Sequence, residues 1–415
     1  MKEESKLLKE SYDIKRRVEM VKMKNGIFRV LTLLLVFGLF VVFSNSSWAQ
    51  QKDALYGTKG LRFGGPEMFA ELHGFVNGVY KDFEGKPDKG GQSTFDLNHL
   101  WLAALAKVHP RVTIFGEVEY EHAGKDTKKL SIVVDRAFID WRVIDRYLTL
   151  RLGTFNPPIG TELRDYVPPI RKFWSRPFYV DEVLLHEWVD AGVRGMGSAM
   201  LVPGMLDIEY DIAVINGPRG LRSDDQNNND NNQDRTFVGR IGFLPQIGEY
   251  SMLELGISYA KGNYDDASQR EFKITVLDAK FNHGGFEIRG EYAKRSGDDQ
   301  TVDPPATLES DGTVKNDAPF TVLADVKGYY LQTAYKVIQN QPSIHYLEPL
   351  IRYDWSEGTK DDRSVADGDE WSRITFGINY SPYPHYLVRA EYQIINEDKV
   401  DKDNNGFALS AVVDF

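Results

Sequence analysis

The sequence predicts an all-β protein, a transmembrane antiparallel β-barrel of about 16 strands with short turns at one end and long loops at the other. Three observations predict this fold. Segments of about 10 residues alternate between apolar and polar side chains, which is the period of a strand with two unlike faces. Short and long connections alternate along the chain. After residue 49, no apolar stretch reaches the roughly 20 residues that a membrane-spanning helix needs.

The first 49 residues have the features of a secretory signal peptide. Basic residues precede the apolar run Val30–Phe43, and Ser47-Trp48-Ala49 follows with the small-x-small pattern of a cleavage site. The run of about 14 residues is too short to span a bilayer as a helix. Residues 1–21 are long and mixed in charge for the start of such a signal, which leaves Met20 and Met23 as alternative starts. We therefore expect a cleaved signal at 1–49, an N-terminal periplasmic segment at 50–67 and a barrel at 68–415.

Composition excludes several other classes of protein. The 415 residues contain no Cys, so disulfides, thiolate metal sites and cysteine nucleophiles are absent. Removal of residues 1–49 takes away nine basic and five acidic residues, which changes the net charge from -11 to about -15. An acidic mature protein lacks the clustered basic surface that nucleic-acid binding needs.

The alternating segments define the expected strands. In Val112–Glu121, for example, Ile114 and Val118 face one way while Glu117 and Glu119 face the other. The same reasoning predicts strands at 68–82, 94–107, 112–121, 130–143, 147–155, 190–201, 206–216, 236–243, 252–261, 272–282, 286–294, 326–337, 344–355, 371–380, 386–396 and 407–415.

The lengths of the connections predict the orientation of the barrel. Short connections lie at 109–110, 144–146, 202–205, 283–285 and 381–385, and long ones at 83–93, 156–189, 217–235, 295–325, 356–370 and 397–405. This asymmetry is typical of a bacterial outer-membrane barrel, with its turns in the periplasm and its loops outside.

A soluble all-β protein is the alternative, because its strands also have one apolar face. Charged side chains on the polar face of nearly every strand favour a water-filled lumen over a packed core. Aromatic residues near strand ends, such as Trp141, Tyr259 and Tyr380, favour a membrane interface. We expect the wall of the lumen to carry Arg136, Arg151, Arg194, Arg240, Arg289, Arg352, Arg373 and Arg389.

The last predicted strand has its apolar side chains on one face and ends in Phe415. This arrangement resembles the assembly signal of bacterial outer-membrane barrels. The resemblance implies that the barrel-assembly machinery recognises Phe415 and that the lipid bilayer of the outer membrane surrounds the protein.

A second resemblance rests on the end of strand 147–155. Gly153, Phe155, Pro158 and Gly160 match the Gly-x-Phe-x-x-Pro-x-Gly segment that precedes the long third loop in the phosphate-selective porin O/P family. The resemblance implies a barrel of 16 strands, usually a homotrimer, whose third loop folds inward and narrows the pore. The implied function is passive diffusion of small hydrophilic solutes, with anions such as phosphate among them.

The third loop carries the residues expected to set selectivity, namely Arg164, Arg171, Lys172 and Arg176. Its centre, Pro168–Pro177, contains only basic charges, so a constriction formed by this centre favours anions. An alternative is that these side chains pair with carboxylates of the barrel wall and hold the loop in place. Many inward positions are acidic, including Glu117, Asp211 and Glu391, which weakens the expectation of anion preference.

Three rival functions stay open. A saccharide-specific porin would show a row of aromatic residues along the lumen, and a structural or adhesive barrel would have a blocked lumen. A barrel hydrolase would need a Ser/His pair on adjacent strands near the outer rim. The chain has no His-x-x-x-His pair, no phosphate-binding Gly-rich loop and no Gly-x-Ser-x-Gly motif, so we expect neither enzymatic activity nor a cofactor.

Two acidic segments are weak candidates for metal sites. Asp401-x-Asp403-x-Asn405-Gly406 begins like a calcium-binding loop, but Val412 occupies the position that should hold a bidentate Glu. A hairpin loop with an Asn-Gly turn is the better interpretation. The run Asp224–Asp234 is likewise interpreted as a solvated external loop, so no metal is expected.

Overall fold

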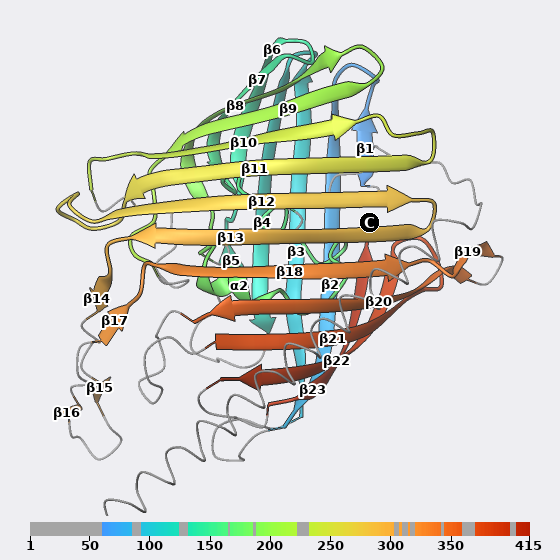
Figure 1. Cartoon of the computed structure of the whole chain (residues 1–415). Coiled ribbons are helices and arrows are strands. Elements are labelled where there is room, and N and C mark those ends of the chain that lie inside the picture. The colour runs from blue at the N-terminus through green and yellow to red at the C-terminus, as the bar shows by residue number, and fades with distance from the viewer. Residues whose placement is uncertain are drawn as a thin grey trace, which may run out of the picture. The chain divides into compact units, whose positions relative to one another are not determined.

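The computed structural model describes residues 60–84, 93–123, 132–164, 167–185, 188–221, 232–302, 307–308, 314–315, 320–341, 344–358, 370–398 and 404–415. They form a closed antiparallel β-barrel of 16 strands (Figure 1). Its strands are β2 (Phe69–Phe83), β3 (Thr94–His109), β4 (Val112–Ala123), β6 (Ala137–Ile144), β7 (Leu148–Phe155), β8 (Asp190–Val202), β9 (Leu206–Ile215), β10 (Thr236–Pro245), β11 (Ser251–Asn263), β12 (Glu271–His283), β13 (Phe286–Gly297), β18 (Val326–Tyr335), β20 (Ile344–Glu357), β21 (Glu370–Ser381), β22 (Tyr386–Glu397) and β23 (Gly406–Asp414).

Each barrel strand pairs with its neighbours in sequence, and β23 pairs with β2 to close the ring. The fold class and the 16 expected strands are therefore confirmed. The expected signal peptide at 1–49 lies outside the described residues. So do Asp401 and Asp403 and most of the run Asp224–Asp234.

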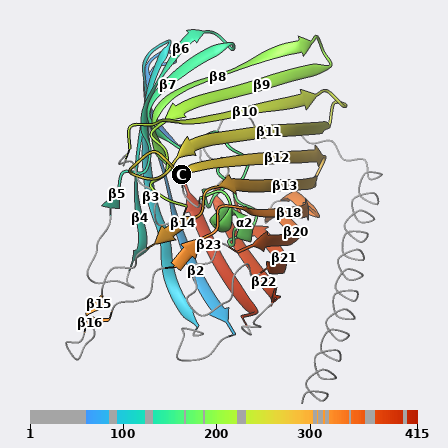
Figure 2. The same ribbon diagram turned by 60° about the vertical axis from the view of Figure 1, so that its left-hand side comes forward.

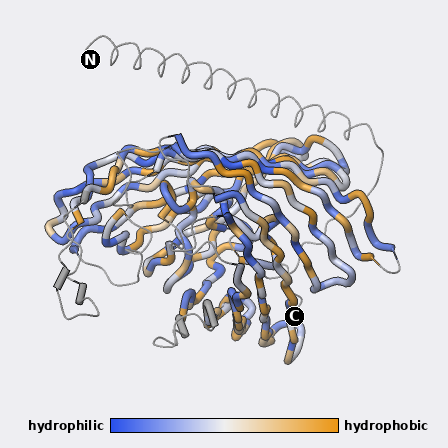
Figure 3. Tube along the Cα trace, turned by 90° about the horizontal axis from the view of Figure 1, so that it is seen from below, coloured by the Kyte–Doolittle hydropathy of each residue, from blue (hydrophilic) through white to orange (hydrophobic). Residues whose placement is uncertain are grey.

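Side-chain burial follows the alternation along each strand. On β4, Ile114 and Val118 are 42% and 38% exposed, whereas Phe115 and Glu117 between them are each 2% exposed. Figure 3 shows hydrophobic and hydrophilic positions alternating along the strands. An apolar outer face and a largely polar inner face are what a barrel in a lipid bilayer requires, because lipid offers no partners to polar groups.

One expected strand, 130–143, is interrupted. The short strand β5 (Ile132–Val133) pairs with β4 up to Glu119. The pairing with β4 then resumes at Gly116, where β6 begins. Three residues of one chain segment, 134–136, thus lie opposite two of β4, which is the geometry of a bulge. Arg136 lies on this bulge, and the bulge directs its side chain to Glu117.

An additional strand, β1 (Leu61–Gly64), lies within the segment 50–67, where no strand was predicted. β1 pairs with Phe69–Leu72 of β2, and β23 pairs with the rest of β2 from Phe75 onward. The two strands therefore divide one edge of β2 between them, so that edge does not stay open.

The remaining elements lie in the connections. β19 (Ile338–Gln341) pairs with β20 in the turn after β18. In the long connection between β13 and β18, β14 (Gln300–Val302) pairs with β17 (Phe320–Val322), and β15 (Thr307–Leu308) pairs with β16 (Val314–Lys315). Helix α2 (Phe178–Glu182) belongs to the connection between β7 and β8 and lies beside β18 and β20 (Figure 2). No helix among the described residues has the length and apolar character needed to cross a membrane.

Candidate functional site

The connection between β7 and β8, residues 156–189, is named loop 3 here, and the chain turns into it at four residues that the sequence singled out. Gly153 has φ +136°, and a Cβ at this position would overlap the carbonyl of Ala137. Phe155 is fully buried, and Pro158 is buried as well. Gly160 has φ +61°, and a Cβ here would overlap the carboxylate of Glu291. The two glycines therefore permit the backbone conformation and the close approach that bring the loop against the inner wall.

Glu291 of β13 binds both halves of loop 3. Its carboxylate accepts hydrogen bonds from the amide of Thr161 at 2.6 Å and from the hydroxyl of Thr161 at 2.7 Å. It also accepts one from the hydroxyl of Tyr179 in α2 at 2.7 Å. Burial raises the pKa of Tyr179 well above its ordinary value, so this hydroxyl stays a donor. Gly160 adds a bond from its amide to Ser258 of β11 at 3.0 Å.

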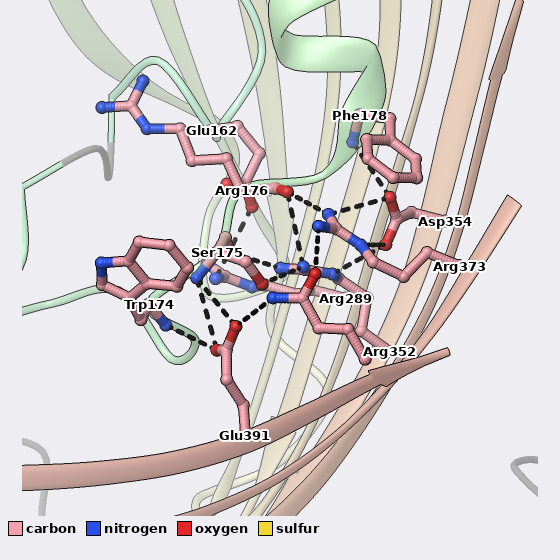
Figure 4. A network of polar contacts seen from close by, with 11 residues as sticks. Glu162, Trp174, Ser175, Arg176, Phe178, Arg289, Arg352, Asp354, Arg373 and Glu391 are labelled. Carbon is pink, nitrogen blue, oxygen red and sulfur yellow. Dashed lines mark hydrogen bonds and ion pairs between the residues drawn. The ribbon is translucent and has the colours of Figure 1, made fainter. Parts of the chain in front are cut away.

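A second attachment lies on β20, β21 and β22 (Figure 4). Glu391 accepts hydrogen bonds from the amides of Trp174 at 2.9 Å and Ser175 at 3.3 Å, and Asp354 accepts one from the amide of Phe178 at 3.0 Å. Arg352 donates to the carbonyl of Ser175 at 2.8 Å, and Arg373 donates to the carbonyl of Arg176. Wall carboxylates thus bind amides of the loop, and wall arginines bind its carbonyls.

A third attachment holds the centre of loop 3. Arg389 of β22 donates to the carbonyls of Pro168 and, at 2.9 Å, of Arg171. Asn379 of β21 donates to the carbonyl of Lys172 at 3.0 Å. Because these bonds use the backbone of the loop, they fix its path independently of its side chains.

These contacts change the role of several arginines that were expected along the lumen. Arg352, Arg373 and Arg389 are on the inner face, but they are 2%, 5% and 2% exposed and bind loop 3. Arg289 is similarly buried and lies 3.6 Å from Glu162 of the loop. These four of the eight expected wall arginines are therefore buried against loop 3 and do not face open water.

Two of the four side chains of loop 3 that were expected to set selectivity form ion pairs with the wall. Arg164 pairs with Glu254 at 2.9 Å, and Lys172 pairs with Glu348 at 2.6 Å. Burial lowers the pKa of Lys172, but the carboxylates of Glu287 and Glu348 raise it more, so its pKa lies above the ordinary value. For Lys172 the geometry therefore fits the alternative in which it holds the loop in place, whereas Arg164 stays 30% exposed beside its pair with Glu254.

Arg171 and Arg176 complete the expected set. The Arg171 residue is 8% exposed, and its carbonyl accepts the bond from Arg389. The carbonyl of Arg176 accepts the bond from Arg373, and Figure 4 shows Arg176 beside the polar contacts of β20 and β21. The structure thus places all four expected residues in the loop inside the barrel.

The second half of loop 3 packs through apolar side chains that the sequence analysis did not single out. Tyr179, Val180, Val183, Leu184 and Leu185 are fully buried. They belong to one core with inward residues of β9 to β12, among them Ile215, Val238, Ala260, Ile274 and Val276. The sequence does contain a sign of this packing. The inward positions of these strands are apolar at the long-loop end, whereas they are charged nearer the short turns.

A water-accessible part of the lumen lies along β6 to β10. Arg151 forms two bonds with Asp140 at 2.7 and 2.8 Å, and Arg146 pairs with Asp207 at 2.9 Å. Arg194 pairs with Asp211, and its side chain is 14% exposed. A cavity of about 360 Å³ lies here, and its lining includes Arg146, Arg164, Arg194, Arg240, Glu209 and Asp211.

The last expected wall residue, Arg136, lies in a buried cluster. It binds Glu117, which also accepts a bond from the Trp101 indole at 3.0 Å, and it reaches Asn156 of loop 3 at 3.2 Å. Phe75 stacks on Trp101, with ring centroids 5.1 Å apart. These two inward aromatic residues are 1% and 0% exposed, so they do not present a surface on which a sugar could stack.

A serine and a histidine do meet on adjacent strands. The hydroxyl of Ser251 lies 2.7 Å from Nδ1 of His283. Both residues are at the short-turn ends of β11 and β12, whereas a barrel hydrolase was expected to carry the pair near the outer rim. Within the described ranges, no group of three potential metal ligands occurs.

Solved structures of outer-membrane channels have the same fold. An anion-selective porin from Comamonas acidovorans is 13% identical, with a TM-score of 0.53 over 84% of this chain and 100% of that chain. Salmonella typhi OmpF in complex with daunomycin is 14% identical, with a TM-score of 0.54 over 86% of this chain and 100% of that chain. The trimer form of in-vitro folded OmpT from Vibrio cholerae is 13% identical, with a TM-score of 0.52 over 83% and 99%.

Sequence comparison identifies the family. An uncharacterized protein of Aquifex aeolicus (strain VF5) is 24% identical over 378 residues, which are 85% of this chain and 79% of that protein. Residues 69–285 match the family described as phosphate-selective porin O and P, and this range covers the motif at the start of loop 3. The chain therefore belongs to the phosphate-selective porin O and P family and is an outer-membrane channel protein.

Proposed function

We propose that the protein is a water-filled channel for passive diffusion of small hydrophilic solutes and that loop 3 forms its constriction. The observation that carries this proposal is the attachment of loop 3 to the inner wall from β9 to β22, while the charged side chains of β6 to β10 nearer the short turns stay exposed to water. A solute would therefore pass between loop 3 and β6 to β10. Charged, hydrated walls suit hydrophilic solutes because they replace the hydrogen bonds of bulk water.

We further propose that the channel favours anions, phosphate among them. Two observations support this narrower proposal: the chain belongs to a family described as phosphate-selective, and the cavity along β6 to β10 is lined by four guanidinium groups and two carboxylates. Charges within a Debye length of about 8 Å act on a passing ion, so the lining of the narrow path matters most. We assign the preference to Arg146, Arg164 and Arg194, because these three line the cavity, whereas Lys172 is paired with Glu348.

The ratio of anion to cation permeability tests both steps. Purified mature protein is inserted into planar bilayers, and the reversal potential is measured across a KCl gradient. One variant carries Gln in place of Arg146, Arg164 and Arg194, and a matched variant carries Gln in place of Arg171, Lys172 and Arg176. In the first variant, we expect the ratio of anion to cation permeability to fall several-fold while the channel still conducts. In the second variant, we expect the conductance to change more than this ratio.

Two outcomes would contradict these proposals. Verified insertion without any conductance would exclude a channel and favour a structural barrel. Loss of anion preference only in the variant of Arg171, Lys172 and Arg176 would show that the centre of loop 3 sets the selectivity.

We also propose export through a signal peptide at residues 1–49, assembly through recognition of the final strand at Phe415, and a homotrimeric state. The similar OmpT structure in a trimer form supports the last of these proposals. Crosslinking of the protein in outer membranes would show trimers if this proposal holds.

A further inference from the structure

Four lysines form a row on the outward face of the barrel at its long-loop end. Lys261, Lys273, Lys294 and Lys327 lie on the consecutive strands β11, β12, β13 and β18. Side chains of Lys261, Lys273 and Lys327 are 50%, 42% and 45% exposed, and Lys294 is exposed as well. We call these four residues the lysine row.

The strand register places like charges side by side. Lys261 is directly opposite Lys273, and Lys294 is directly opposite Lys327. Side chains at opposed positions are about 5 Å apart at Cβ, and like charges there repel each other. A bound anion would remove this repulsion.

Four carboxylates reduce the positive charge of the lysine row, and one of them, Asp298, acts on Lys273. Glu271 bridges Lys261 and Lys273, and Glu357 lies 3.1 Å from Lys327. Glu370 is opposite Glu357 on the next strand. Lys294 forms no ion pair with any residue in the part of the chain that the structure describes, whereas the other three lysines each have a carboxylate partner, so its ammonium group is the one most available to an anion.

Tyrosines lie directly below the lysine row, toward the short-turn end. Tyr259, Tyr292 and Tyr329 are each two residues from a lysine of the row and share its outward face. Tyrosine collects at the level of lipid headgroups, because one end of its ring is apolar and the other is polar. The lysine row is therefore at the level of headgroups in the outer leaflet.

An apolar groove of about 540 Å³ continues below the tyrosines on the same strands. Its floor is formed where Ala279 is opposite Gly290, the two smallest outward positions in this region. Its outward rim includes Leu253, Leu277, Phe281, Ile288, Tyr292, Tyr329 and Leu331. A groove of this kind on a lipid-facing wall fits an acyl chain.

We propose that the lysine row and this groove together bind an outer-leaflet lipid with a phosphate-bearing headgroup. The phosphate contacts Lys294 and its neighbours Lys273 and Lys327, and an acyl chain lies across Ala279 and Gly290. The cationic row, the tyrosines and the groove follow one another along the strands in the order of phosphate, interface and acyl chain in such a lipid. The site is on the outside of the barrel, so this inference is independent of the proposed channel.

Native mass spectrometry of the detergent-purified barrel tests the proposal. The probes are lipid A, dephosphorylated lipid A and inorganic phosphate. We expect lipid A to bind at least tenfold more tightly than either of the other two, since only lipid A offers both phosphate and acyl chains.

Two variants and one control separate the headgroup from the groove. Replacement of Lys273, Lys294 and Lys327 by Gln should lower lipid A binding about tenfold, and Ala279→Phe should weaken both lipids by filling the groove. The control replaces Lys81, Lys107 and Lys336 by Gln, which removes the same charge from β2, from β3 and from the turn after β18. Heat-modifiable migration on gels verifies that each variant is folded.

Equal binding of lipid A to the wild type and to the variant of the lysine row would overturn the proposal. Binding of inorganic phosphate as tight as that of lipid A would overturn it too, because the site would then recognise the free anion. A loss of lipid A binding in the control as large as that in the variant of the row would attribute the effect to net charge and contradict a local site.

Discussion

Lys172 of loop 3 and Glu348 of β20 form an ion pair, with 2.6 Å between Nζ and Oε1, although 176 residues separate them in the sequence. Glu348 is 2% exposed and also accepts a bond from Asn379, so it joins the loop to two strands of the wall. The pair shows why a cation of loop 3 cannot be assigned to selectivity from its charge alone.

Lys172→Met should loosen the centre of loop 3. The substitution leaves the carboxylate of Glu348 buried without its cation, which costs on the order of 3 kcal/mol. We expect a larger and noisier single-channel conductance together with a lower midpoint of thermal unfolding. Lys172→Arg, which keeps the charge, is the control, and unchanged conductance in Lys172→Met would contradict a role of this pair in fixing the loop.

The ion pair between Lys172 and Glu348 should not depend on pH between 6 and 9. Glu287 and Glu348 hold the pKa of Lys172 above its ordinary value despite burial, so the ammonium group stays charged in this range. The stability from a raised pKa is fully present below the unfolded value of about 10.4 and is lost as pH rises through the folded value. The difference in conductance between the wild type and Lys172→Met, measured from pH 6 to 11, should therefore change only at the alkaline end. A change centred near neutral pH would have to come from other groups.

Glu391→Ala should expose loop 3 to trypsin. Glu391 accepts hydrogen bonds from the amides of Trp174 and Ser175, which lie close to the trypsin sites at Arg171 and Lys172. Without this acceptor the two amides lose their partner inside the protein, and local opening becomes more frequent. Limited proteolysis of the folded barrel should cut the variant at least several-fold faster than the wild type. Equal rates would mean that the contacts of Arg352, Arg373 and Arg389 suffice.

Gly160→Ala should weaken the junction between β7 and loop 3 by about 1–3 kcal/mol. The backbone has φ +61°, and the new methyl group would overlap the carboxylate of Glu291. Gly204→Ala is a matched control, because Gly204 has φ +70° and nothing lies within 4 Å of its Cβ. The control therefore has the backbone strain without the overlap. Chemical denaturation should separate the two variants, and equal losses of stability would assign the whole effect to the backbone.

Phe415→Asp should impair formation of the barrel. Phe415 and Gly74 exchange backbone hydrogen bonds of 3.2 and 3.0 Å, and the Phe415 ring is outward and lies beside the position of a Cβ on Gly74. A carboxylate at this lipid-facing position is unfavourable and gives up the contact that covers Gly74. We expect a lower yield of heat-modifiable, membrane-integrated protein than from Phe415→Leu. The same yield from both variants would show that the side chain is dispensable for closure.

The sequence alone determined the class of the protein and the 16 strands of the barrel, apart from the interruption before β6. Alternation such as that of Ile114 and Phe115 is a local property, because successive side chains of any strand point to opposite faces. The lengths of the connections are local as well. The motif from Gly153 to Gly160 could be recognised because the backbone conformation at both glycines restricts the residue type.

Only the tertiary structure decided which inward charges face water. Arg194 and Arg389 both occupy inward positions of strands and look alike in sequence, yet Arg194 lines the cavity and Arg389 holds the carbonyl of Arg171. The difference arises because loop 3 covers one side of the wall and leaves the other open. That choice depends on contacts such as Lys172 with Glu348, between residues far apart in sequence, and periodicity along a single strand contains no information about such partners.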